Sequence, residues 1–113
     1  MTATTDTLRD SPAVRQWHES YQLFWRSGPP PDAALRSLER FVERCEQQPD
    51  EIVDEVLRPG PAGEGLMMRT RARRKYMQLI EEFEQHEGSR ETANHVRSFM
   101  IHNGIAMSPG ILR

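Results

Sequence analysis

Apolar side chains recur at intervals of three and four residues in every stretch between the proline and glycine breaks of the chain. This spacing is that of an α-helix, whereas no run of strand length alternates between apolar and polar residues. The pattern predicts five helices, over residues 11–27, 32–46, 49–57, 66–87 and 89–103. We therefore expect an all-α fold, a compact bundle of four or five helices.

The predicted helix ends carry residues that suit such positions. Ser11 and Ser89 can accept hydrogen bonds from free amides of a first turn, and Asp32 is a further candidate for this capping role. Gly88 ends the fourth helix, and Gly104 suits the left-handed position after the fifth. These signals support the boundaries independently of the apolar spacing.

One face of each predicted helix is apolar, and these faces together would form the core. On sequence grounds it stays open whether the aromatic residues of the first helix all lie in the core or partly at an interface. The expected core residues are Val14, Trp17, Tyr21, Leu23, Phe24 and Trp25; Leu35, Leu38, Phe41, Val42 and Cys45; Ile52, Val53, Val56 and Leu57; Met68, Ala72, Tyr76, Leu79, Ile80 and Phe83; and Ala93, Val96, Phe99, Met100 and Ile105.

The 113 residues suit one domain with a modest core. We assign residues 11–105 to it, because neither the three helices before the glycine-rich segment nor the two after it would fold alone. Residues 1–10 are polar and rich in threonine, and we expect a disordered lead-in. Residues 58–65 are rich in proline and glycine and predict a flexible linker. Residues 106–113 are expected to form a tail.

Composition narrows the possible functions. The chain has 15 basic and 17 acidic residues, a net charge of -2, so only a local concentration of positive charge would favour nucleic acid. Cys45 is the single cysteine and cannot form an internal disulfide, which favours a reducing, cytoplasmic location. No apolar run approaches the roughly 20 residues that span a bilayer, so we expect no membrane partner.

Candidate catalytic and metal-binding groups do not converge in the sequence. The histidines, His18, His86, His95 and His102, are spread over three predicted helices, and no two of them have the four-residue spacing typical of a pair of metal ligands on one helical face. Cys45 lies on an apolar stripe, which is typical of a small core residue. We therefore expect no enzymatic activity, no metal, no cofactor and no small-molecule substrate.

The strongest local signal is the charge order along the predicted fourth helix, whose first half is basic and whose second half is acidic. Cations at a helix N-terminus oppose the macrodipole, so stability alone does not favour this order. Clustered arginines offer donors to phosphates and base edges, although a solvated face without a partner is the alternative. The expected DNA-binding residues are Arg69, Arg71, Arg73, Arg74 and Lys75, with Arg90, His95, Arg97 and His102 from the fifth helix.

Several segments resemble one family. Residues 73–83 (RRKYMQLIEEF), 89–99 (SRETANHVRSF) and 102–105 (HNGI), preceded by 35–43 (LRSLERFVE) and 49–52 (PDEI), are similar to the SAM-like core-binding domain of tyrosine recombinases and phage integrases. The resemblance covers about residues 33 to 105, and its motifs consist mostly of helix-packing residues. It implies a helical bundle that grips one face of duplex DNA at a recombination site.

The resemblance also implies roles for individual residues. By position, the DNA-facing residues are Arg71, Arg74, Lys75, Arg90, His95, Arg97 and His102. The family's catalytic residues belong to a C-terminal domain outside the matched segments, and Tyr21 and Tyr76 lie on apolar stripes, so neither is expected to act as a nucleophile.

A second hypothesis is a helical protein-interaction domain, a homodimer or an adaptor, that does not bind DNA. Trp17, Trp25, Met67 and Met107 are its candidate anchors, because tryptophan and methionine are enriched at protein interfaces. The two hypotheses differ in whether the cations of the fourth and fifth helices converge on one surface.

Overall fold

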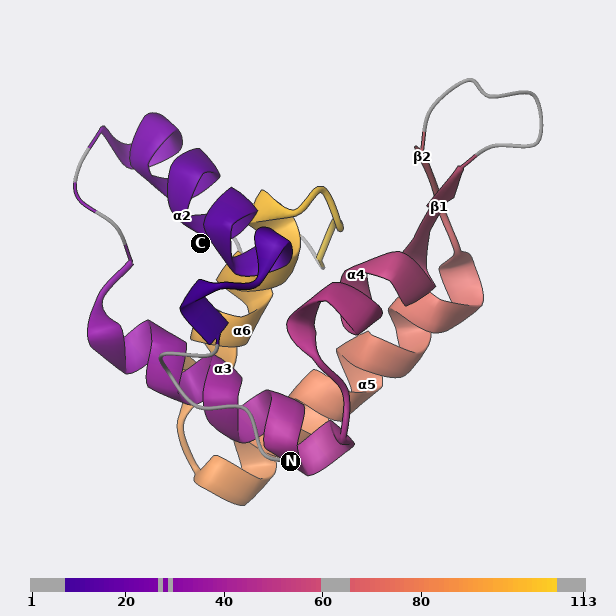
Figure 1. The fold of residues 1–113 in the computed structure, drawn as a ribbon. Coiled ribbons are helices and arrows are strands. Elements are labelled where there is room, and N and C mark those ends of the chain that lie inside the picture. The colour runs from indigo at the N-terminus through magenta and orange to yellow at the C-terminus, as the bar shows by residue number, and fades with distance from the viewer. Residues whose placement is uncertain (1–7, 27, 29, 60–65, 108–113) are drawn as a thin grey trace.

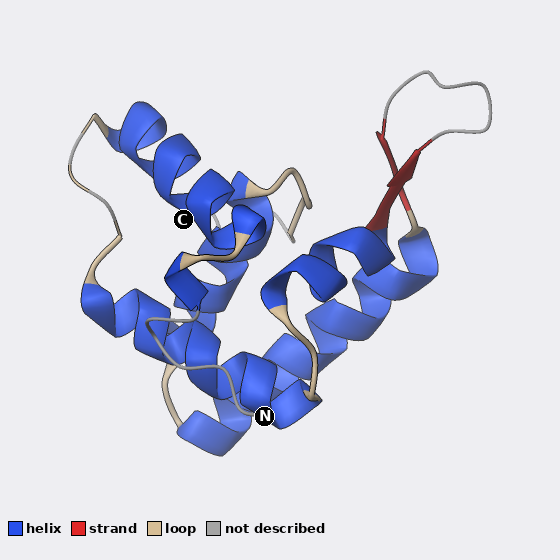
Figure 2. Cartoon of the chain, viewed as in Figure 1, coloured by secondary structure: helices blue, strands red, loops and turns tan. Residues whose placement is uncertain are grey.

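The computed structural model describes residues 8–26, 28, 30–59 and 66–107, which fold into a helical bundle with one projecting β-hairpin (Figures 1 and 2). The expected bundle of helices is therefore confirmed, and the hairpin is an addition to it. The elements in chain order are α2 (Pro12–Trp25), α3 (Asp32–Cys45), α4 (Pro49–Val56), β1 (Leu57–Pro59), β2 (Leu66–Met68), α5 (Thr70–Glu87) and α6 (Arg90–His102).

The start of α2 is held by its own cap and by α4. The side chain of Ser11 accepts a hydrogen bond from the amide of Val14, as the sequence predicts. The carboxylate of Asp50 in α4 accepts two more hydrogen bonds, both at 2.8 Å, from the Ser11 hydroxyl and from the Ala13 amide. Because free amides at a helix start need acceptors, Asp50 fixes where α2 begins relative to α4.

The junction between α5 and α6 also follows the sequence. Gly88 ends α5 with φ at 66°, a backbone conformation that glycine adopts without strain, and the Ser89 side chain accepts from the Thr92 amide at 3.1 Å. The expected cap at Asp32 is wrong. Pro31 is the extended residue before α3, and Asp32 is the first helical residue, where a carboxylate still faces the positive helix end.

The hairpin corrects two predictions. Residues 66–68 form β2 and not the first turn of a helix, and positions 58 and 59, expected in a flexible linker, belong to β1. The strands pair antiparallel, with Leu57 opposite Met68 and Arg58 opposite Met67. Strands of three residues are too short to show an alternating pattern, so apolar spacing does not predict them. The remaining linker positions, 60–65, lie outside the described residues.

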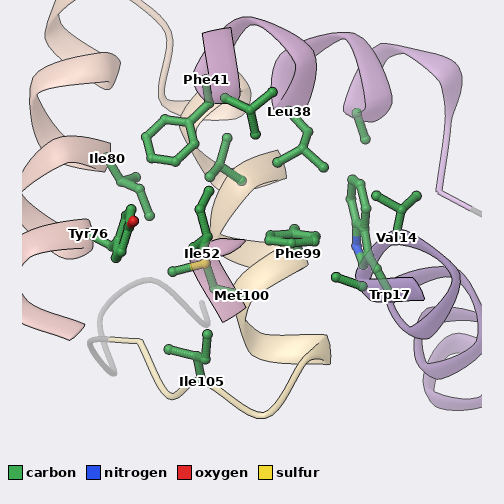
Figure 3. Packing of buried hydrophobic residues seen from close by; sticks show 14 of the residues in the cluster. Val14, Trp17, Leu38, Phe41, Ile52, Tyr76, Ile80, Phe99, Met100 and Ile105 are labelled. Atoms are coloured by element: carbon green, nitrogen blue, oxygen red, sulfur yellow. The ribbon is translucent and has the colours of Figure 1, made fainter. Parts of the chain in front are cut away.

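The core is centred on α6, which packs against α2, α3 and α5. On one side of α6, Phe99 meets Trp17 edge-on with ring centroids 5.7 Å apart, and the Trp17 indole donates to the Ser98 hydroxyl at 3.1 Å. Farther along the core, Phe41 and Phe83 join α3 to α5 with ring centroids 5.4 Å apart. Side chains from five helices thus meet in one buried cluster (Figure 3).

The ends of the described chain are more ordered than the sequence predicts. Leu8 is buried within the segment expected to be a disordered lead-in, whose first seven residues lie outside the described ones. Ile105 packs on the end of α6 as expected, since it is fully buried and its amide donates to Met100 at 2.9 Å. Met107 is also buried, so the expected tail begins later than residue 106, and residues 108–113 are not described.

The second half of α2 does not follow its predicted core stripe. Val14 and Trp17 are buried as expected, but Leu23, Phe24 and Trp25 are 80%, 70% and 59% exposed. The last turn of α2 lies at the end of α6, where Phe24 meets the His102 ring edge-on with ring centroids 6.0 Å apart, and this contact leaves most of each of the three side chains exposed. A separate finding concerns membranes: in the described part of the chain, every helix is too short or too polar to span a bilayer.

Candidate nucleic-acid interface

The exposed cations of the predicted DNA surface gather where the hairpin meets the start of α5. Arg69, Arg71 and Arg74 are exposed there, and Arg58 in β1 is exposed beside them. Among the described residues, no hydrogen bond or ion pair involves these four side chains, although the charge of Arg69 contributes to lowering the pKa of Glu55 in α4. We call these four residues the basic hairpin end; Figure 1 shows the hairpin projecting away from the bundle at this place.

Strand geometry explains why the arginines of the hairpin share a side. Arg58 lies opposite Met67 in the antiparallel pair, and successive side chains of a strand point to opposite faces. Arg69 follows Met67 by two residues with extended backbone, and its amide continues the ladder by donating to the Val56 carbonyl at 2.7 Å. Arg58, Met67 and Arg69 therefore lie on one face of the ribbon, while Leu57 and Met68 point to the other.

Two other cations of the cluster are engaged within the fold. The Lys75 ammonium pairs with Glu55 of α4 and lies 4.8 Å from the centre of the Tyr76 ring. Arg73 donates from Nε to the Ala106 carbonyl at 2.7 Å and thereby holds the segment after α6 against α5. These two side chains stabilise the fold, so they are poorly placed to lead a DNA surface.

Glu55 is the centre of a small polar network between α4 and α5. The Tyr76 hydroxyl donates to its Oε1 at 2.6 Å. Burial opposes ionisation of Glu55, but the hydrogen bonds from Lys75 and Tyr76 outweigh it and lower the pKa of the carboxyl. Burial, followed by the hydrogen bond to Glu55, raises the pKa of the Tyr76 phenol, which therefore stays protonated. The sequence suggested a core tyrosine here, and the structure adds its anionic acceptor.

Arg97 was expected to face DNA, and the structure shows that it does not. Its side chain is only 7% exposed and donates from Nη1 to Glu84 at 2.8 Å and to Asn94 at 2.9 Å. The hydrogen bond from Arg97 is the main reason why the pKa of Glu84 is lowered. Arg97 follows Ala93 by four residues and precedes Met100 by three, so its position on the buried stripe of α6 could have been found in the sequence.

The remaining candidates on α6 supply little charge. Arg90 is exposed, but its Nε lies 3.7 Å from Oε2 of Glu84, the carboxylate that also pairs with Arg97. His95 shares a hydrogen bond of 2.8 Å with Ser37, and His102 shares one of 2.8 Å with Ser20. Burial lowers the pKa of both histidines, which favours their neutral forms. The sequence led us to expect that the cations of α5 and α6 converge on one surface, and the structure shows that they do not.

The half-buried histidines predict a stability that falls in acid. Burial also lowers the pKa of His18, whose Nε2 is buried without a hydrogen-bond partner in the described chain. A pKa lower in the folded than in the unfolded state gives stability that is complete above about pH 6.5 and decreases as the pH falls through the folded-state value. We expect urea denaturation to give a smaller free energy of unfolding at about pH 5 than at about pH 7.

A variant separates this effect from the titration of carboxylates. Replacing His95 and His102 by glutamine keeps a hydrogen-bonding group beside each serine but removes the charge change. The difference in unfolding free energy between the two pH values is expected to shrink. Glu55 and Glu84 lose their stabilising effect only below about pH 4.5, so they contribute little to the difference between pH 7 and pH 5. An unchanged difference in the variant would therefore show that neither His95 nor His102 causes the acid sensitivity.

Two further kinds of site, a metal centre and a reactive thiol, find no supporting geometry among the described residues. No cluster of three or more histidine, cysteine, aspartate or glutamate side chains could hold a metal ion there. The Cys45 thiol donates to the Phe41 carbonyl at 3.1 Å, and burial raises its pKa, so it is held in its unreactive thiol form.

The anchors expected for a protein interface divide into two kinds. Trp17 and Met107 are buried in the core, so neither can protrude as an anchor into a partner. Trp25 and Met67 are 59% and 53% exposed; Trp25 ends α2 and Met67 lies in β2, two elements on opposite sides of the bundle in Figure 1. No protein-family model, curated protein or solved structure matches the chain. The interpretation of these surfaces therefore depends on their own chemistry.

Proposed function

We propose that this chain is a DNA-binding module that contacts the phosphate backbone of a duplex through the basic hairpin end. The observation that carries the proposal is the gathering of Arg58, Arg69, Arg71 and Arg74 without intramolecular ion pairs. Arg9, Arg40, Arg90 and Arg97 have carboxylate partners, and the other exposed arginines, such as Arg15, Arg36 and Arg44, lie on α2 and α3, away from the hairpin. Arginines that are left unpaired at one end of an otherwise acidic molecule provide the local positive charge that DNA binding requires.

The placement of these arginines favours an anionic partner over a purely structural role. Arg71 lies in the first turn of α5, where free amides and the helix dipole already make the potential positive. A cation there opposes the dipole and costs stability, typically about 0.3–1 kcal/mol. A phosphate group beside this helix end would be attracted by both the arginines and the amides.

The hairpin suits this role in shape. The major groove of B-DNA admits a two-stranded β-ribbon, and this ribbon carries Arg58 and Arg69 on one face. Contacts from these arginines to the phosphates that line the groove would position the protein on the duplex without reading its sequence. The resemblance to the SAM-like core-binding domain of tyrosine recombinases supports the same class of partner, and we propose a role in DNA recombination within the cytoplasm on that basis.

The test is duplex binding as a function of salt. Replacing Arg69, Arg71 and Arg74 together by glutamine is expected to weaken binding at least about tenfold at low salt. It should also reduce the slope of log affinity against log salt by up to about 3, since each lost phosphate contact removes roughly one unit. Fluorescence anisotropy with a labelled duplex of mixed sequence measures both quantities.

A matched control removes the same charge elsewhere. Arg15, Arg36 and Arg44 are exposed on α2 and α3, and their triple replacement by glutamine leaves the net charge equal to that of the first variant. We expect the control to keep most of the affinity and salt dependence. Equal losses in the two variants would refute a local surface at the hairpin, and no duplex binding by the unaltered chain at low salt would refute the function itself.

A further inference from the structure

An apolar protrusion and an apolar hollow lie side by side at the end of the bundle opposite the hairpin. The protrusion, which we call the aromatic knob, consists of Leu23, Phe24 and Trp25 at the end of α2. The knob is preorganised, because Phe24 packs edge-on against Trp25 with ring centroids 5.0 Å apart, and Trp25 lies 6.3 Å from the Tyr21 ring. Exposed aromatic side chains that already hold one another lose little freedom on binding.

The hollow is a groove of about 450 Å³ between α2, the start of α3 and the first half of α6. We call it the α2–α6 groove. Its apolar wall contains Trp17, Tyr21, Pro30 and Pro31, and its opposite edge carries Asn94 and His95. Tyr21 belongs to the groove wall and also packs against the knob, so the two features adjoin at this residue.

We propose that two copies of this chain associate through this face, with the aromatic knob of each copy seated in the α2–α6 groove of the other. A two-fold dimer brings the same face of both copies together, so a protrusion on one copy meets the neighbouring hollow of the other twice. One chain therefore carries both halves of the contact.

The knob alone offers a sizeable contact area for a second copy. The three knob side chains expose about 400 Å² between them at the observed exposed fractions, given the usual size of such side chains. A standard interface buries about 800 Å² on each partner. The knob thus provides roughly half of this area. The groove floor adds little to it, because Trp17 and Ala34 are buried there, so exposed residues of α2 and α6 around the groove would have to supply the rest.

Charge at the rim also favours a second copy over a nucleic acid or a lipid surface. Glu19 and Arg26 flank the knob, and Arg90 and Glu91 flank the groove, all four exposed. A rim that carries both signs next to each feature can meet an identical rim with opposite charges paired. A polyanion would instead favour a face of one sign, such as the basic hairpin end.

The experiment measures the mass of the full chain over a range of concentrations by sedimentation equilibrium. We expect a reversible dimer, and replacing Phe24 and Trp25 by serine should weaken it about 30-fold or more, as for other buried aromatic anchors. Circular dichroism should show unchanged helicity, because both side chains are exposed. Met67→Ser is the matched control, since it removes a similarly exposed apolar side chain from the hairpin and should leave the dimer intact.

A mixing experiment tests the pairing of knob with groove. Glu91→Trp places a bulky side chain at the groove edge and should weaken the dimer without touching the knob. A mixture of this variant with the knob variant keeps one intact knob and one intact groove, so it should associate more tightly than either variant alone. A monomeric unaltered chain, a dimer that survives the loss of the knob, or a mixture that gains nothing would each overturn the proposal.

Discussion

Replacing Phe99 by alanine is expected to lower the free energy of unfolding by about 3–5 kcal/mol, a large part of the stability of a domain of this size. Phe99 is fully buried in α6, the helix that contacts three others, and its ring packs against Trp17. Alanine would leave a cavity between α6 and α2 that the helices can fill only by moving. Urea denaturation followed by circular dichroism measures the change.

Phe24→Ala is the matched control, because it makes the same chemical change on a side chain that is 70% exposed. Measured at a concentration too low for association of two copies, this variant should change the unfolding free energy by no more than about 0.5 kcal/mol. Similar losses in the two variants would contradict the placement of α6 at the centre of the core. Phe99→Leu, which leaves a smaller cavity, should lie between them.

The sequence predicts the helices well because each has a long apolar stripe and distinctive end residues. α6 is the clearest case, with Ser89 at its start and Ala93, Val96 and Phe99 on one face, and the structure confirms all four roles. The β-hairpin has no such signal, since strands of three residues do not establish an alternating pattern. It is formed by pairing across a gap of several residues, which a local pattern cannot reveal.

The candidate site was harder to predict than the fold, for a physical reason. Arginine and lysine attract phosphates and carboxylates alike, so the sequence shows the cations but not which of them the fold pairs internally. Lys75 and Arg97 pair with glutamates that lie 20 and 13 residues away in the chain. Arg71 and Arg74 form no ion pair with a carboxylate among the described residues. Helical spacing alone could have placed Arg97 inside the bundle, but only the packing of α4 on α5 brings Glu55 to Lys75.

Removing the carboxylate that pairs with Arg97 is the second change with a large expected effect. Glu84→Ala should lower the free energy of unfolding by about 2–3 kcal/mol, because it leaves a buried guanidinium without its counter-ion. The loss stays below that of a fully buried pair, since the Glu84 side chain is 26% exposed and Asn94 still accepts one hydrogen bond. Glu81→Ala, on the exposed face of α5, is the control and should have little effect.

The pair can also be removed as a whole. A double variant, Glu84→Gln with Arg97→Met, replaces the buried charge by an apolar side chain of similar length and should recover most of the loss of Glu84→Ala. The pKa of Glu84 is lowered in the folded state, so its contribution is complete above about pH 4.5 and is lost as the pH falls through the lower folded value. The double variant should therefore show a weaker acid dependence in this range. If Glu84→Ala instead behaves like Glu81→Ala, the ion pair with Glu84 does not stabilise the buried Arg97, and the fold tolerates this guanidinium with Asn94 as its acceptor.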